Sequence, residues 1–149
     1  MAVMSLNLEP LTIHSVREHL RQRNFSAREL VEAYLGVIEE RNPELRAYVE
    51  VFDDVRGQAD AADRILAREG KSAPELTGVP LAIKDNILIE GRRASACSHM
   101  LESYVASYDA TVIAKLKAAG AVFLGRTNMD EFAMGSSTER SCHGPTRNP

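Results

Sequence analysis

The chain has 149 residues, of which 44% are hydrophobic and 26% are charged, and its formal net charge at neutral pH is −3. This length is enough for one ordinary domain with a single core, and the balance of apolar and charged residues excludes a disordered protein. The slightly acidic charge gives no overall electrostatic reason to bind nucleic acid, so such binding would need a local patch or a partner.

The N-terminal seventy residues are predicted to be mainly helical. A first helix is expected after Thr12, whose hydroxyl can cap it. Ser26 and Glu29 have the spacing of a capping box, and apolar residues then recur at helical intervals. We expect this second helix to end at the Asn42-Pro43 pair.

A short strand and a third helix are predicted next. Residues 48–51 alternate in polarity, which favours a strand or an extended link. The following helix is expected to run from near Asp53 to Gly70. Its small, alanine-rich face suits close packing against a larger body.

The pattern changes in the second half of the chain. Residues 78–83 and 121–124 are short apolar runs of strand length. A helix is expected between them, with Asp109 as its N-cap and Gly120 in the position of a C-terminal capping glycine. Two buried strands joined through a helix predict a parallel βαβ unit.

The last part of the chain is predicted to be mostly loop. Asn128 and Glu131 have the spacing of a further capping pair, but residues 135–149 show no apolar period. We expect that the natural protein continues, because a domain seldom ends in such a stretch after an incomplete sheet.

Localisation follows from what the sequence lacks. No window approaches the roughly 20 apolar residues of a spanning helix, and residues 1–10 show no secretory signal pattern. Cys97 and Cys142 lack the Cys-x-x-Cys spacing and are expected to be free thiols. A cytoplasmic protein that does not enter a membrane is therefore expected.

Few familiar catalytic motifs are present. The sequence has neither the Gly-x-Ser-x-Gly turn of α/β-hydrolases nor a phosphate-binding loop ending in Gly-Lys-Ser/Thr. Two cysteine–histidine pairs could act as nucleophile and base or as metal ligands: Cys97 with His99, and Cys142 with His143. Since neither pair has a third group in the sequence pattern, a structural or surface role is favoured and no metal site is predicted.

Lys84 follows the apolar run 78–83 directly, where α/β sheets place ligands and catalytic groups. A lysine there can act as a general base only if its pKa falls well below the ordinary value of about 10.4. Ser136 and Ser137 offer hydroxyls in a loop, but spacing cannot show an activating base. From residues alone, a solvated lysine and ordinary loop serines are favoured.

Several segments closely resemble the amidase signature family. They are Leu76–Asn86, Tyr108–Val112, Gly125–Asn128, Thr127–Glu139 and Gly144–Pro149. The resemblance is weak across the N-terminal helices and strong from Leu76 onward. It implies an α/β fold in which the N-terminal helices precede the first part of an α/β/α mixed sheet. Residues 1–149 would then be a single partial domain, with a helical region over 1–70 and the start of the core over 76–149.

The family uses a Ser–cis-Ser–Lys triad, and Lys84 matches its catalytic lysine. By this resemblance, Lys84 takes the proton of a bridging serine, which activates a second serine to attack an amide carbonyl and release ammonia. The family's Gly-Gly-Ser-Ser-Gly-Gly-Ser segment, which carries the bridging serine, is missing and would follow Pro149. The 149 residues alone are therefore expected to be inactive. Gly135, Ser136 and Ser137 precede that segment and are expected only to line the substrate pocket.

The Thr127–Glu139 segment is similar to the version found in the A subunits of glutamyl-tRNA(Gln) amidotransferases. Such a protein hydrolyses glutamine and passes ammonia to the B subunit, and the small C subunit embraces it. The B subunit binds Glu-tRNA(Gln), ATP and Mg²⁺, so the resemblance implies no cofactor in this chain. Two alternatives are a fragment of a stand-alone amidase and a short non-catalytic protein that binds a partner.

Overall fold

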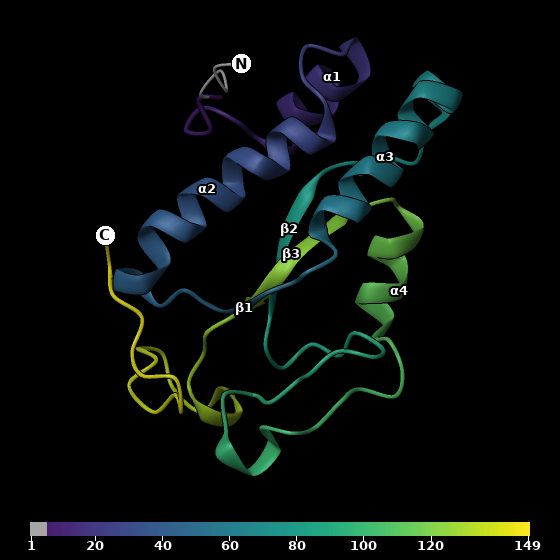
Figure 1. Ribbon diagram of the computed structural model, residues 1–149. Helices are drawn as coiled ribbons and strands as arrows, with labels where there is room; N and C mark the ends of the chain where they lie inside the picture. The colour runs from purple at the N-terminus through teal and green to yellow at the C-terminus, as the bar shows by residue number, and fades with distance from the viewer. Residues whose placement is uncertain (1–5) are drawn as a thin grey trace.

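The computed structural model describes residues 6–149 and has mixed α/β architecture. The elements follow the chain in this order: α1 (Ile13–Gln22), α2 (Ala27–Leu45), β1 (Tyr48–Val51), α3 (Val55–Glu69), η1 (Gly70–Ser72), β2 (Pro80–Lys84), η2 (His99–Leu101), α4 (Thr111–Ala118), β3 (Val122–Thr127) and η3 (Glu131–Ala133). The predicted α/β class is confirmed (Figure 1).

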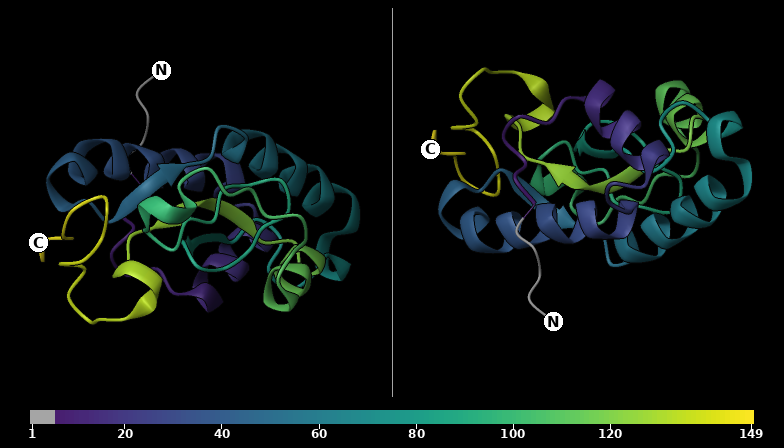
Figure 2. Two further views of the ribbon diagram at one scale, coloured as in Figure 1. Left: turned by 90° about the horizontal axis from the view of Figure 1, so that it is seen from below. Right: turned by 90° about the horizontal axis from the view of Figure 1, so that it is seen from above.

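The three strands form one sheet in the order β1–β3–β2. Central β3 runs parallel to β2 and antiparallel to β1, so the sheet is mixed. The parallel β2–β3 pair joined through α4 confirms the predicted βαβ unit. Figure 2 shows α2 and α3 covering one face of the sheet, while α1 and α4 lie on the other.

The core lies where α2 packs on α3 and α3 packs on β3. Leu30 and Val31 of α2 and Val55 and Ala59 of α3 are all buried. Every residue of β3 from Val122 to Arg126 is buried as well, as expected for a central strand with helices on both faces.

Both predicted N-caps are present. The Thr12 hydroxyl accepts the Ser15 N–H at 3.1 Å. The Ser26 hydroxyl accepts the Glu29 N–H at 3.0 Å, and the Glu29 carboxylate accepts the Ser26 N–H at 2.8 Å. This reciprocal pair satisfies two backbone donors that the helix itself leaves free.

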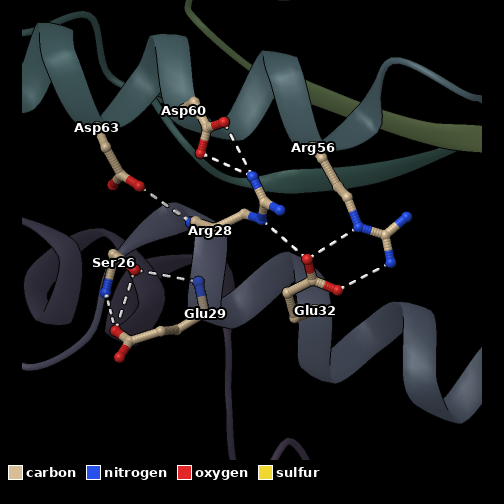
Figure 3. A network of polar contacts seen from close by, with 7 residues as sticks. All are labelled: Ser26, Arg28, Glu29, Glu32, Arg56, Asp60 and Asp63. Carbon is tan, nitrogen blue, oxygen red and sulfur yellow. Dashed lines mark hydrogen bonds and ion pairs between the residues drawn. The ribbon is translucent and has the colours of Figure 1, made fainter.

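A polar seam joins α2 to α3 (Figure 3). The Arg28 guanidinium contacts Asp60 at 2.9 Å, while Arg56 and Arg28 share the carboxylate of Glu32. Asp63 accepts the Arg28 backbone N–H at 3.1 Å. A carboxylate at this helix start also suits the positive end of the helix dipole, so Asp63 anchors α2 to α3.

The predicted end of α2 was wrong by a few residues. The helix continues through Pro43 to Leu45, and the Arg46 N–H still reaches the Asn42 carbonyl at 2.8 Å. A proline near the end of a helix removes one hydrogen bond without stopping the turn that follows it. The Asn42 amide instead binds both backbone groups of Tyr48, which positions the start of β1.

Two other predicted caps were also wrong. Asp109 does not cap α4, because the N-cap of this helix is Ala110. The Asp109 carboxylate instead accepts the Glu90 N–H at 2.8 Å and binds Lys117. Asn128 caps no helix, because only the 3-10 turn η3 follows it. Gly120 does have the left-handed φ of +85° predicted for a capping glycine.

Within residues 6–149, no helix combines the length and the apolar character needed to cross a membrane.

Candidate functional site

The carboxyl ends of the parallel strands β2 and β3 meet at one edge of the sheet. Lys84 is the last residue of β2 and pairs in register with Thr127, the last residue of β3. Its side chain is exposed and makes no hydrogen bond or ion pair with any residue of the described range 6–149. The amine is therefore available at the edge where α/β sheets bind ligands.

Asp85 follows Lys84 directly and points the opposite way, into the protein. It is fully buried and accepts hydrogen bonds from the Ser95 hydroxyl at 2.5 Å and the Cys97 N–H at 2.9 Å. Burial by itself raises the pKa of Asp85, but these hydrogen bonds and the neighbouring Arg126 charge outweigh it and lower the pKa. The carboxylate is ionised at neutral pH.

Arg126 of β3 lies between two carboxylates. The residue is 6% exposed, pairs with Asp85 on one side and binds Glu50 of β1 at 2.6 Å on the other. This chain of charges ties all three strands together beside Lys84. Because a buried charge is stable only when paired, the three side chains hold one another in place.

A bent loop wraps around Asp85. Ala96 and Cys97 both have left-handed φ values, 48° and 49°, which non-glycine residues adopt at a cost of about 1–3 kcal/mol. The bend brings the Cys97 thiol to 3.5 Å from the Asp85 carboxylate. Burial, and then the charge of Asp85, raises the pKa of the Cys97 thiol to about 11. Cys97 therefore remains a neutral thiol at neutral pH, and both cysteines are free as predicted.

Asn128 organises the loop that follows β3. Its amide nitrogen donates to the carbonyls of Arg46 at 3.1 Å and Gly144 at 2.8 Å, and its oxygen accepts the Ser141 hydroxyl at 2.6 Å. These partners lie far apart in the sequence. One side chain thus fastens the C-terminal loop to the end of α2.

Asp130 shapes the segment that contains the predicted pocket residues. Its carboxylate accepts the backbone N–H groups of Ser137 at 3.0 Å, Thr138 at 2.8 Å and Arg140 at 3.1 Å. A Cβ placed on Gly135 would lie 2.5 Å from this carboxylate, so glycine is required for the close approach. The Ser137 N–H is consequently occupied and is not free to bind a substrate oxygen.

The structure brings the predicted site residues together only in part. Gly135, Ser136 and Ser137 lie on the loop after β3, and no hydrogen bond within residues 6–149 links either serine to Lys84. Sequence reasoning missed the buried residues behind the lysine, Asp85 and Arg126. The position of Asp85, close behind an apolar strand, is the sequence feature that could have predicted a role for it at this edge.

The fold does not group Cys97 with His99, the neighbour with which the sequence paired it. His99 contacts Glu102 at 3.2 Å, whereas the Cys97 thiol groups with His143 and Asp85. The partner of Cys97 is therefore the histidine of the other pair, and the third group is Asp85.

Comparison of the whole chain with known proteins shows the family to which it belongs. The profile of the family described as Amidase matches residues 29–149, which is most of the chain.

The chain belongs to the amidase family.

Its similarity to individual amidase-family proteins covers nearly all of its length. The curated A subunit of glutamyl-tRNA(Gln) amidotransferase from Granulibacter bethesdensis is 49% identical over 95% of this chain and 28% of its own length. Among solved structures, the corresponding protein from Thermotoga maritima has 38% identity and a TM-score of 0.74, over 97% of this chain and 28% of that one. Peptide amidase from Stenotrophomonas maltophilia has 32% identity and a TM-score of 0.83, over 94% and 30%.

These comparisons confirm the resemblance found in the sequence and the amidase-type fold. The chain spans less than a third of the length of the curated relatives it matches.

Proposed function

We propose that this chain forms the N-terminal part of a glutamine-hydrolysing A subunit of glutamyl-tRNA(Gln) amidotransferase, with Lys84 as its catalytic base. The observation that carries the proposal is the place of Lys84 at the carboxyl end of β2, in a chain 49% identical to a protein of that name. Ligands of α/β sheets bind at this end.

The proposed chemistry divides between this chain and residues of a longer protein. Lys84 takes the proton of a bridging serine, which activates the nucleophilic serine that attacks the side-chain amide of glutamine. A lysine accepts a proton only as the neutral amine, and burial favours that form. Lys84 is exposed within residues 6–149, so we propose that the following part of the longer protein covers it. The 149 residues alone would release no ammonia.

Residues 1–149 are proposed to form one partial domain rather than two. The helical region 1–70 and the core region 76–149 share a single apolar cluster that includes Leu30, Val55 and Val122. Gly135, Ser136 and Ser137 are proposed to line the glutamine pocket, since Asp130 fixes the loop that carries them at the Lys84 edge.

The proposed partners are the B and C subunits of the amidotransferase. The B subunit would bind Glu-tRNA(Gln), ATP and Mg²⁺, and would use the ammonia to form Gln-tRNA(Gln). The charge of −3 and the missing phosphate-binding loop fit a chain that leaves tRNA and ATP to its partner. A cytoplasmic location is proposed together with this tRNA-amidating complex.

The experiment that tests the proposal replaces the matching segment of the Thermotoga maritima protein with this chain and assembles the chimera with the B and C subunits. Amidation of Glu-tRNA(Gln) is measured with glutamine and, separately, with ammonium chloride. Lys84→Ala should lower the glutamine-dependent rate by at least about 10²-fold, the contribution of a general base. The ammonium-dependent rate should not change.

The matched control is Lys115→Ala, which removes another exposed lysine from α4. Both of its rates should equal those of the parent chimera. Retention of glutamine-dependent activity in Lys84→Ala would refute the catalytic role, while loss of both rates would show that Lys84 acts in assembly.

A stand-alone amidase is the second candidate. The observation that favours it is the TM-score of 0.83 with peptide amidase, which exceeds the 0.74 with the Thermotoga maritima amidotransferase protein. Co-expression of the full gene product with the B and C subunits separates the two. Co-purification of a three-protein complex supports the amidotransferase, and hydrolysis of small amides without partners supports the amidase.

A further inference from the structure

Three potential metal ligands from distant parts of the chain converge behind the Lys84 edge. They are a carboxylate oxygen of Asp85, the sulfur of Cys97 and a ring nitrogen of His143, and these atoms all lie within 4.8 Å of one another. Asp85 and Cys97 are buried, while His143 is exposed. The group therefore has a rigid inner side and an opening to solvent.

We propose that Asp85, Cys97 and His143 form a binding site for a soft divalent cation of the zinc class. Thiolate, imidazole and carboxylate are the three ligand types that zinc uses in proteins. Three protein ligands with an open fourth position, filled by water, give the usual four-coordinate geometry.

The spacing of the donors supports this assignment. The Cys97 sulfur lies 3.5 Å from Oδ2 of Asp85. Zinc–sulfur and zinc–oxygen bonds of about 2.3 Å and 2.0–2.2 Å at a tetrahedral angle separate the two ligand atoms by about 3.5 Å. The ion would take the place of the thiol proton, which Cys97 can donate to this carboxylate or to the Asn128 side-chain oxygen at 3.4 Å. A ring nitrogen of His143 lies within 4.8 Å of both the Cys97 sulfur and the Asp85 ligand oxygen.

The ligands are held by other parts of the fold. The Ser95 hydroxyl and the Cys97 N–H fix the Asp85 carboxylate. The Cys142 N–H donates to the Cys97 carbonyl at 3.0 Å, which anchors the loop carrying His143 beside Cys97. Hydrogen-bonded outer contacts of this kind orient the ligands of protein metal sites.

The charges around the site are compatible with a dication. Arg126 pairs with Asp85 but also binds Glu50 at 2.6 Å, so it keeps a carboxylate partner if Asp85 shifts toward a metal. On binding, Cys97 loses its thiol proton to solvent and becomes a thiolate. The two carboxylates and this thiolate then balance the arginine and the dication.

The proposed metal site adjoins the proposed catalytic lysine in the chain. Lys84 precedes the ligand Asp85 directly, although its side chain lies on the exposed side. Metal binding itself does not depend on the proposed function.

The experiment is a Co²⁺ titration of the 149-residue chain, with competition by Zn²⁺. Cobalt reports a four-coordinate site through its visible bands and reports a thiolate through a charge-transfer band in the near ultraviolet. Both signals should appear with a stoichiometry of a single ion per chain, and Zn²⁺ should abolish them. Cys97→Ser should remove the charge-transfer band, and His143→Gln should weaken binding at least about tenfold.

Matched controls are the other cysteine, Cys142, and another histidine, His99. Cys142→Ser and His99→Gln remove the same chemical groups outside the cluster, so both variants should bind Co²⁺ like the parent chain. Far-ultraviolet circular dichroism confirms that each variant is folded. Absence of the thiolate band in the folded parent chain overturns the proposal, and so does its loss in Cys142→Ser with retention in Cys97→Ser.

Discussion

The Arg126 guanidinium of β3 and the Asp85 carboxylate at the end of β2 form an ion pair in which the arginine side chain is 8% exposed and the carboxylate is fully buried. Removing one member of a buried pair costs about 3–5 kcal/mol when the other charge is left without a partner. Because Glu50 still binds Arg126, we expect Asp85→Asn to lower the free energy of unfolding by up to this amount, measured by urea denaturation. Glu75→Gln, which removes the exposed partner of Arg17, should change it by less than about 1 kcal/mol. Equal losses in both variants would contradict the role of burial.

Acid should destabilise the chain through carboxylates whose pKa is lowered in the folded state. Backbone hydrogen bonds from Arg140, Thr138 and Ser137 lower the pKa of Asp130. A carboxylate whose pKa is lower in the folded state than in the unfolded state stabilises the fold fully above the unfolded-state pKa of about 3.9. This stabilisation is lost as the pH falls through the folded-state pKa. Unfolding free energy should therefore stay level from neutral pH to about 5 and decline below about 4. Asp130→Asn should decline less steeply there, and an unchanged slope would exclude Asp130 as a contributor.

Two glycines should respond oppositely to alanine. A Cβ on Gly125 of β3 would collide with the Glu50 carbonyl of β1, whereas Gly57 of α3 has no atom within 4 Å of that position. Gly125→Ala should force the strands apart and destabilise the chain by more than about 2 kcal/mol. Gly57→Ala should stabilise it by about 0.5–1 kcal/mol, because glycine is a poor helix residue. Thermal unfolding followed by circular dichroism measures both, and a stable Gly125→Ala variant would show that β1 can move.

Lys84 should be dispensable for folding. Its side chain is exposed and has no polar partner within residues 6–149, so Lys84→Ala should change the unfolding free energy of this chain by no more than about 0.5 kcal/mol. Chemical denaturation of the two proteins side by side provides the measurement. A loss above about 2 kcal/mol would reveal a structural role and would weaken the case for catalysis.

Local signals in the sequence predicted local structure well. The caps at Thr12 and Ser26 bond to residues three positions away, and the left-handed Gly120 depends on its own backbone. The predictions failed where a polar side chain had a distant partner. Asn128 resembles a helix cap in sequence, but its amide binds the carbonyl of Arg46, 82 residues earlier.

The position of Lys84 at a strand end also depended on a local signal, whereas its catalytic role stays a prediction. The apolar run before Lys84 was enough to place the lysine at the end of a strand. The resemblance to the family then supplied the role that position alone did not favour. The cluster of Asp85, Cys97 and His143 could not be read from the sequence, because only the folded loops bring these residues together.

The order of the strands has a consequence for how the chain folds during synthesis. The middle strand, β3, is the last of the three along the chain, so β1 and β2 have no partner until residue 127 has left the ribosome. Until then the buried residues of α2 and α3, among them Leu30 and Val55, lack the β3 residues of their shared apolar cluster. Apolar surfaces left uncovered during folding bind chaperones and promote aggregation. Emergence of β3 is therefore the step at which the three strands of this part of the protein can form their sheet.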